Sequence, residues 1–284
     1  SSVVLDAPVV FKDRNGNVWR PQNDRGGFRG PMRLREALVQ SRNLVSVRLL
    51  DSIGVNFARD YITRFGFAKE ALPPNLSMSL GTASLTPISV ARGYSVFANG
   101  GFLIEPYFIK SVTGPSGVMI GYSHPKRACG LCPERLAGDT SKAVVVDGFD
   151  LSDSGLAQDE LAKAGAGFDP SAPGPPGTAL APQTIDPRNA FLISDMMLDV
   201  VRRGTAVQAK VLERADIGGK TGSTNNHRDA WFVGFGGDLV TAVWVGKDDF
   251  KPLGSGEYGG RAALPIWIDY MRAALDGVPL KTME

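Results

Sequence analysis

A lysine between small residues is the first place in this chain where chemistry could occur. The segment Gly219–Thr224 reads Gly-Lys-Thr-Gly-Ser-Thr. Its glycines allow another backbone to approach closely, and Lys220 with the neighbouring hydroxyls can hold a carboxylate. Such a strand edge can also accept an extended peptide as an added strand. The competing interpretation is a glycine-rich strand with a solvated lysine. A phosphate-binding P-loop does not fit, because the glycine that it requires would fall at Arg214.

Ser41, Arg42 and Asn43 form the second candidate, at the expected junction of two helices. A serine hydroxyl and an asparagine amide two residues apart can face one cleft if the backbone bends between them. The amide both donates and accepts hydrogen bonds, which suits it to fixing a substrate amide. The competing interpretation is ordinary helix capping by serine and asparagine.

Proline, glycine and hydrophobic spacing indicate the elements that must position these residues. A capping residue before proline marks a helix start, and glycine marks a helix end. Helices are predicted from residue 31 and over 44–53, 56–65, 87–98, 187–203 and 264–275. One face of helix 187–203 is expected to carry Phe191, Leu192, Met196, Val200 and Val201. Strands are predicted over 102–112, 217–224, 230–235 and 239–246, with a hairpin around Asn15-Gly16.

This order of helices, strands and a closing helix predicts an α+β fold with an antiparallel β-sheet flanked by helices. The 284 residues are 43% hydrophobic, which suffices for a sizeable core. Residues 113–185 differ, because their second half is rich in glycine, alanine, proline and serine. We therefore expect one domain over 1–284 with 113–185 as an insertion or loop region. A net charge of +2 gives no reason to expect nucleic acid as a partner.

In this order, the two motifs resemble the active site of penicillin-binding proteins and serine β-lactamases. That superfamily uses Ser-x-x-Lys, then Ser-x-Asn, then Lys-Thr-Gly. The surrounding sequence is similar to class A penicillin-binding proteins over most of residues 20–110 and 186–276. The similar segments are Arg33–Leu38, Leu80-Gly81, Thr86-Pro87, Ala91–Tyr94, Ala98–Gly101, Ile217–Gly222 and Asp229–Phe232.

The resemblance implies a role for each matching residue. Ser41 would relay protons to the leaving amine or the acceptor, and Asn43 would hold the amide of the peptide or β-lactam. Lys220 would supply positive potential near the Ser41 hydroxyl and the substrate carboxylate. The backbone N–H of Ser223 would form half of the oxyanion hole. The implied substrate-binding strand comprises Thr221, Gly222, Ser223 and Thr224.

The departure from the family pattern that matters is the missing nucleophile motif. No Ser-x-x-Lys occurs in residues 1–40, and the single match, Ser123–Lys126, follows Ser-x-Asn and contains a proline. We therefore expect the nucleophilic serine, its lysine base and two sheet strands to lie upstream of Ser1. The fold would be a penicillin-binding, β-lactamase-like one, incomplete at its N-terminus.

The resemblance implies a D,D-transpeptidase that cross-links peptidoglycan stem peptides ending in D-Ala-D-Ala and is acylated by β-lactam antibiotics. It would work on the periplasmic side of the bacterial inner membrane, anchored by a segment outside this chain. The chain alone would be inactive and would need the N-terminal portion of the same protein. The alternatives are a D,D-carboxypeptidase or β-lactamase-like hydrolase and a catalytically silent peptidoglycan-binding module.

Two smaller features of the sequence are a pair of cysteines and a histidine after the Lys-Thr-Gly strand. Cys129 and Cys132 could be a redox pair, half of a metal site or a local disulfide. Structural zinc needs four ligands and no second pair is present, so no metal or other cofactor is expected. In a periplasmic protein a local disulfide would be the expected state. His227 is interpreted as a turn residue.

Overall fold

The computed structural model describes residues 2–12, 16–24, 26–130, 132, 145–146, 149–150 and 179–281. Contacts divide the chain into two units, one made of 1–103 with 183–284 and the other of 104–182. The first unit combines helices with an antiparallel sheet, so the predicted α+β class is confirmed. It contains both candidate motifs.

The main sheet has three antiparallel strands in the order β11-β10-β9. These are β9 (Gly218–Ser223), β10 (Asp229–Gly236) and β11 (Leu239–Gly246), close to the predicted ranges. Gly236 pairs with Leu239, so Gly237 and Asp238 form the turn. Gly237 has φ +53°, a conformation that glycine adopts at little cost. Among the described strands of this sheet, β9 and β11 are the edges, which exposes the Lys-Thr-Gly segment on one side.

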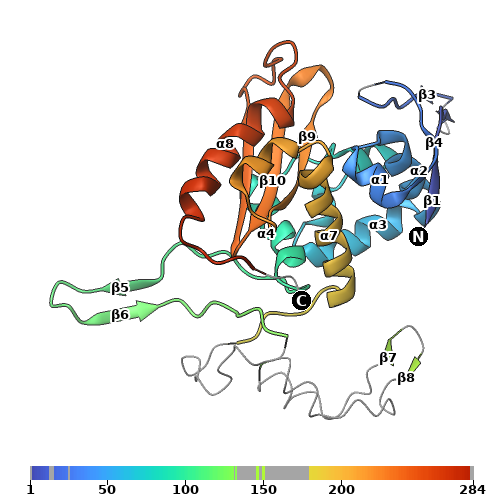
Figure 1. Cartoon of the computed structure of the whole chain (residues 1–284). Coiled ribbons are helices and arrows are strands. Elements are labelled where there is room, and N and C mark those ends of the chain that lie inside the picture. The colour runs from blue at the N-terminus through green and yellow to red at the C-terminus, as the bar shows by residue number, and fades with distance from the viewer. Residues whose placement is uncertain are drawn as a thin grey trace. The chain divides into compact units, whose positions relative to one another are not determined.

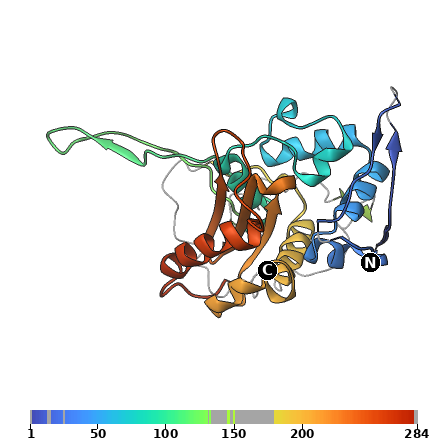
Figure 2. The ribbon, with the colours of Figure 1, turned by 90° about the horizontal axis from the view of Figure 1, so that it is seen from above.

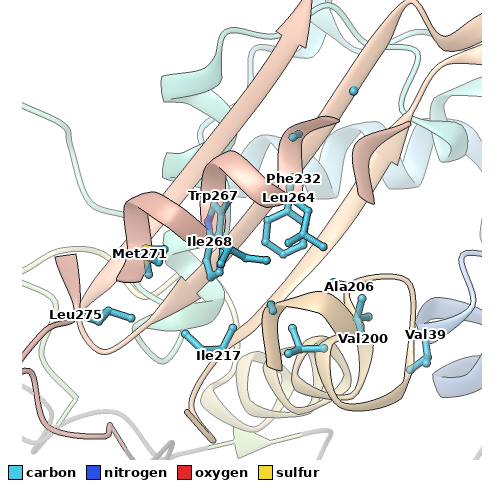
Figure 3. Packing of buried hydrophobic residues seen from close by; sticks show 14 residues of the cluster. Val39, Val200, Ala206, Ile217, Phe232, Leu264, Trp267, Ile268, Met271 and Leu275 are labelled. Atoms are coloured by element: carbon cyan, nitrogen blue, oxygen red, sulfur yellow. The ribbon is translucent and has the colours of Figure 1, made fainter. Parts of the chain in front are cut away.

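Helices cover both faces of this sheet (Figures 1 and 2). Because side chains alternate along a strand, Phe232 and Phe235 of β10 face opposite sides. Phe232 packs edge-on against Trp267 of α8 (Gly259–Ala274), with ring centroids 4.9 Å apart. Phe235 packs with residues of α4 (Pro87–Ala98) and α7 (Pro187–Arg203). Figure 3 shows the α8 side of this core, which also takes in Val39 and Val200.

Several predicted helix boundaries are confirmed. Helix α2 (Asn43–Ile53) ends at Gly54, and α3 (Val55–Ile62) continues through a 3₁₀ turn to Gly66. The Thr86 side chain accepts a hydrogen bond from a backbone N–H at the start of α4, and Asp186 does so at the start of α7. These polar caps satisfy donors that have no partner within the helix.

The predicted helix start at Pro31 is wrong. Pro31 lies in β4 (Gly30–Arg33), paired antiparallel with β1 (Val3–Asp6), and α1 (Leu34–Val39) begins three residues later. A two-stranded pair can accommodate proline because its missing N–H can face the open side. The hairpin prediction is confirmed by the antiparallel pairing of β2 (Phe11–Lys12) with β3 (Val18–Trp19), although Asn15 lies outside the described residues.

The predicted strand over 102–112 is also wrong. Phe102 forms one isolated bridge with Gln183, and pairing resumes only at β5 (Ser111–Thr113). Pro106 interrupts the run, since proline cannot donate to a strand ladder. Helix α8 begins earlier than predicted, with Pro265 inside it. On α7, Phe191 and Leu192 are exposed, whereas Val200 and Val201 are buried as expected.

In the second unit, β5 pairs antiparallel with β6 (Met119–Tyr122), and β7 (Val145–Val146) pairs with β8 (Phe149–Asp150). The insertion prediction otherwise falls largely outside the described residues. None of the helices that the structure describes has the length and apolar character needed to span a membrane.

Candidate active site

The structure brings the two candidate motifs together. The Lys220 ammonium group donates one hydrogen bond to the Ser41 hydroxyl, with 2.8 Å between Nζ and Oγ. It donates a second, at 2.9 Å, to the Thr221 carbonyl oxygen. The first contact joins a turn between α1 and α2 to the edge strand of the sheet. A hydroxyl held by a lysine at hydrogen-bond distance is a group through which a proton can pass.

Burial changes the acidity of this lysine. The loss of solvent around the ammonium group lowers the pKa of Lys220 to about 8. A buried cation is disfavoured relative to its neutral form, which explains the direction. Lys220 is therefore mostly charged at neutral pH but loses its proton under mildly alkaline conditions.

Ser41 stands in a strained conformation. Its φ is +53°, in the left-handed region that side chains other than glycine rarely adopt. Two backbone hydrogen bonds shape the turn, from the Ser41 N–H to the Leu38 carbonyl (3.1 Å) and from the Arg42 N–H to the Ala37 carbonyl (2.9 Å). This bend directs the Ser41 hydroxyl toward Lys220.

The backbone of β9 presents hydrogen-bonding groups at its open edge. The Thr224 N–H donates to the Asp229 carbonyl at 3.1 Å, which fixes the phase of the antiparallel ladder. Because bonded and non-bonded pairs alternate, the N–H and C=O groups of Thr221 and Ser223 point away from β10. The contact of the Thr221 carbonyl with Lys220 agrees with this direction. An extended peptide could pair with this edge as an added strand.

The hydroxyls of β9 contact protein groups. The Thr221 hydroxyl lies 2.7 Å from that of Thr205, and the Ser223 hydroxyl accepts from the Gly259 N–H at 2.9 Å. The Thr224 hydroxyl accepts from the N–H groups of Arg228 (3.1 Å) and Asp229 (2.8 Å) and so caps the following turn. Each hydroxyl is thereby oriented by a neighbouring element.

Close packing explains the glycines here. A side chain at Gly259 would collide with the backbone oxygens of Gly222 and Trp231. The start of α8 can therefore approach the substrate-binding segment only because position 259 has no side chain.

Asn43 is the first residue of α2, and its side-chain amide donates to the Gln22 carbonyl at 2.9 Å. This bond fixes the side chain against the loop before β4. A role for Asn43 in holding a substrate amide stays a prediction.

Sequence reasoning missed a buried ion pair behind the Ser41 turn. Two nitrogens of Arg42 contact the same Asp6 carboxylate oxygen, at 2.9 and 2.7 Å. Burial raises the pKa of Asp6, but hydrogen bonds from Asn23, Arg42 and the Arg29 N–H outweigh it and leave the pKa below its usual value. The one available signal was an arginine between two candidate site residues; nothing in the sequence singled out Asp6.

A charged network also joins α1 to α7. Arg35 contacts Asp195 and Asp199, at 2.6 and 3.0 Å, while Arg203 contacts Glu36 at 2.7 Å and Asp199 at 2.9 Å. These residues connect the helix before Ser41 with the helix that leads to Thr205. The network thus links the two elements that support the site.

The remaining candidates are a serine and two cysteines of the second unit and a histidine in the turn after β9. Cys129 and Cys132 are not joined by a disulfide bond in this structure, and formation of that bond under oxidising conditions stays a prediction. The Ser123 hydroxyl donates to the Ile109 carbonyl within the second unit. His227 sits in a 3₁₀ turn, as predicted, and its Nδ1 is buried.

Known proteins share this fold and sequence. Residues 9–130 match the model of the penicillin binding protein transpeptidase domain. Over its full length the chain is 43% identical to penicillin-binding protein 1A of Pseudomonas aeruginosa, of which it covers 34%. It is 42% identical to penicillin-binding protein 1A of Neisseria lactamica, of which it covers 30%. The chain therefore spans about a third of the length of these curated relatives.

Solved structures agree. The whole chain superposes on 40% of the crystal structure of penicillin-binding protein 1A from Haemophilus influenzae, with a TM-score of 0.82 and 33% identity. It also matches 65% of the PonA1 protein from Mycobacterium tuberculosis in complex with penicillin V, with a TM-score of 0.68. At 22% identity, this second match reports on the fold alone. The chain belongs to the transpeptidase family of penicillin-binding proteins. Within it, the resemblance to class A is confirmed, because the relatives named above are penicillin-binding proteins 1A.

Proposed function

We propose that this chain forms part of a D,D-transpeptidase that cross-links peptidoglycan stem peptides by serine acyl transfer. The observation that carries the proposal is the contact of Lys220 Nζ with Ser41 Oγ, which joins residues 179 positions apart in the chain. A lone Lys-Thr-Gly strand could be solvated, and a lone Ser-x-Asn turn could be a helix cap. Their meeting at hydrogen-bond distance favours a shared catalytic cleft.

The proposed reaction proceeds through two acyl transfers. A serine upstream of residue 1 attacks the carbonyl carbon of the D-Ala-D-Ala amide and forms an ester, while the terminal D-Ala leaves as an amine. The amine of a second stem peptide then attacks the ester and releases the serine. Ser41 passes a proton to the leaving amine in the first step and relays a proton from the acceptor in the second.

The strand β9 would bind and activate the donor peptide. Its open edge pairs with the extended peptide, and the N–H of Ser223 donates to the oxygen that becomes negative in the transition state. The charge of Lys220 and the hydroxyls of Thr221 and Ser223 hold the terminal carboxylate. Thr224 supports the end of the strand, because its hydroxyl caps the next turn. Asn43 holds the amide of the peptide or of a β-lactam.

β-Lactams would acylate the same serine. Penicillin V is bound by one structural relative, the PonA1 protein. We extend β-lactam binding to the whole protein that contains this chain. The N-terminal portion of the same protein, a membrane anchor and a position on the periplasmic side of the inner membrane belong to the same proposal.

The test uses the whole protein with fluorescent penicillin and with a donor peptide ending in D-Ala-D-Ala. We expect a covalent label and, with an acceptor amine, a cross-linked product. Release of acyl groups to water alone would favour the carboxypeptidase or β-lactamase alternative. Failure to label would favour a silent binding module. Covalent labelling of residues 1–284 in isolation would contradict the upstream position of the nucleophile.

A further inference from the structure

We propose that Asp6 and Arg42 act as a positioning pair that holds Ser41 and Asn43 in their catalytic geometry. This inference rests on the proposed function. It assigns a role to two residues that contact neither the Lys-Thr-Gly strand nor, in the proposed reaction, the substrate.

The argument begins with the strain at Ser41. A left-handed backbone at a serine is unfavourable and persists only where the surrounding structure enforces it. The residue that follows is Arg42, whose side chain is among the few buried charged groups of the described chain. Its guanidinium group is fixed by the Asp6 carboxylate and, at 2.7 Å, by the Gly27 carbonyl. With Arg42 held at its far end, the turn cannot relax without displacing a buried charge.

The Asp6 carboxylate reaches both sides of the motif. Asp6 is fully buried, and Asn23 donates to it at 2.8 Å. The same Asn23 side chain accepts from the Leu44 N–H at 3.3 Å, next to Asn43. The neighbouring Gln22 carbonyl receives the Asn43 amide. Asp6 thus contacts Arg42, the residue before Asn43, directly. It is linked to Leu44, the residue after Asn43, through the Asn23 side chain.

A purely structural ion pair is the competing explanation. Two features favour positioning. The network contacts the side chains of Arg42 and Asn43 and the backbone N–H of Leu44. The strained residue next to them, Ser41, is the one whose hydroxyl contacts Lys220. Burying two charges also offers little stability relative to an apolar pair of similar volume, so stability alone explains it poorly.

The test, made in the whole protein, separates an effect of the pair on folding stability from an effect on the geometry of Ser41 and Asn43. The double variant Asp6→Leu with Arg42→Met replaces the charges with apolar side chains and can retain the melting temperature. We expect the rate constant of acylation by fluorescent penicillin to fall about 100-fold, because small displacements of catalytic groups are that costly. The dissociation constant of the initial penicillin complex should change much less.

Arg48 provides a matched control. It also lies on α2 and contacts the segment after β1, through the Ala7 and Pro8 carbonyls, but one turn away from the motif. Arg48→Met should leave the acylation rate constant unchanged. A double variant that folds and acylates at the unsubstituted rate would overturn the proposal. If that variant does not fold, Arg42→Lys keeps the charge but not the forked contact. Arg42→Lys should acylate about tenfold more slowly than the unsubstituted protein. An unchanged rate constant would also overturn the proposal.

A crystal structure of the folded variant tests the pair independently of activity. With the pair removed, Ser41 should move to a negative φ and its hydroxyl should leave Lys220. An unchanged left-handed Ser41 would reject the positioning role even if the protein proved not to react with penicillin. Absence of acylation in the unsubstituted protein would instead reject the proposed function.

Discussion

The two walls of the candidate site are built in different ways. The Lys220 wall is strand β9, whose backbone is fixed by its register with β10; its hydroxyls add contacts to Thr205 and to the Gly259 N–H. The Ser41 wall is a strained turn fixed by a buried carboxylate and guanidinium group. A strand held by its backbone tolerates changes of side chain, whereas a turn held by buried side chains does not. The walls should therefore respond differently to substitution.

The largest effect is expected where the turn depends on a single buried charge. Asp6→Ala leaves the Arg42 guanidinium without its carboxylate, and removal of one partner of a buried pair costs about 3–5 kcal/mol. Chemical denaturation should show this loss in the free energy of unfolding. Asp24→Ala, at an exposed position in the loop next to Asn23, is the control and should change it by less than about 0.5 kcal/mol. A small loss for Asp6→Ala would mean that the turn is held by its backbone after all.

On the strand wall the largest effect should be chemical. Lys220→Met keeps the length of the side chain but removes the charge beside Ser41. We expect penicillin acylation of the whole protein to slow about 100-fold, the range seen when one electrostatic contact to a transition state is lost. The melting temperature should hardly fall, because burial already disfavours the charge that is removed. Lys247→Met, on an exposed lysine just after β11, should acylate normally. Collapse of the fold in Lys220→Met would show that this strand also depends on its side chains.

The pH dependence of both acylation and stability should reflect the titration of Lys220. If Lys220 acts as a cation, acylation is fastest below its pKa of about 8 and declines above it. The charged fraction then falls about tenfold for each pH unit. Stability should show the opposite trend. The unfolded chain keeps this proton up to about pH 10.5, so the group makes the free energy of unfolding rise with pH between 8 and 10.5. Both slopes should vanish in Lys220→Met, and an acylation rate that increases through pH 8 would indicate that neutral lysine is the active form.

The sequence predicted the Lys220 wall better than the Ser41 wall, because a strand leaves local signals in the sequence and a turn held by distant side chains does not. Alternating apolar residues and paired glycines are local signals, so β9, β10 and β11 were located closely. The Asp6–Arg42 pair joins residues far apart in the chain and leaves no periodic trace. Pro31 misled because proline suits both a helix start and an edge strand. The run from Phe102 had strand-forming residues, but Phe102 bridges the distant Gln183 and Pro106 cannot donate to a ladder, so composition alone was misleading.

Ser223 offers the finest test of the comparison. Ser223→Ala removes the acceptor of the Gly259 N–H but leaves the backbone N–H of residue 223 at the open edge of β9. We expect the free energy of unfolding to fall by about 1 kcal/mol, the usual net value of one hydrogen bond. Acylation should slow through the loss of one hydrogen bond to the substrate carboxylate, but less than in Lys220→Met, because the oxyanion donor belongs to the backbone. Ser223→Thr keeps a hydroxyl and should restore stability, as denaturation curves of the three proteins would show. If Ser223→Ala instead slowed acylation as strongly as Lys220→Met, the hydroxyl and not the backbone would be the essential group, and the contrast between the two walls would fail at this position.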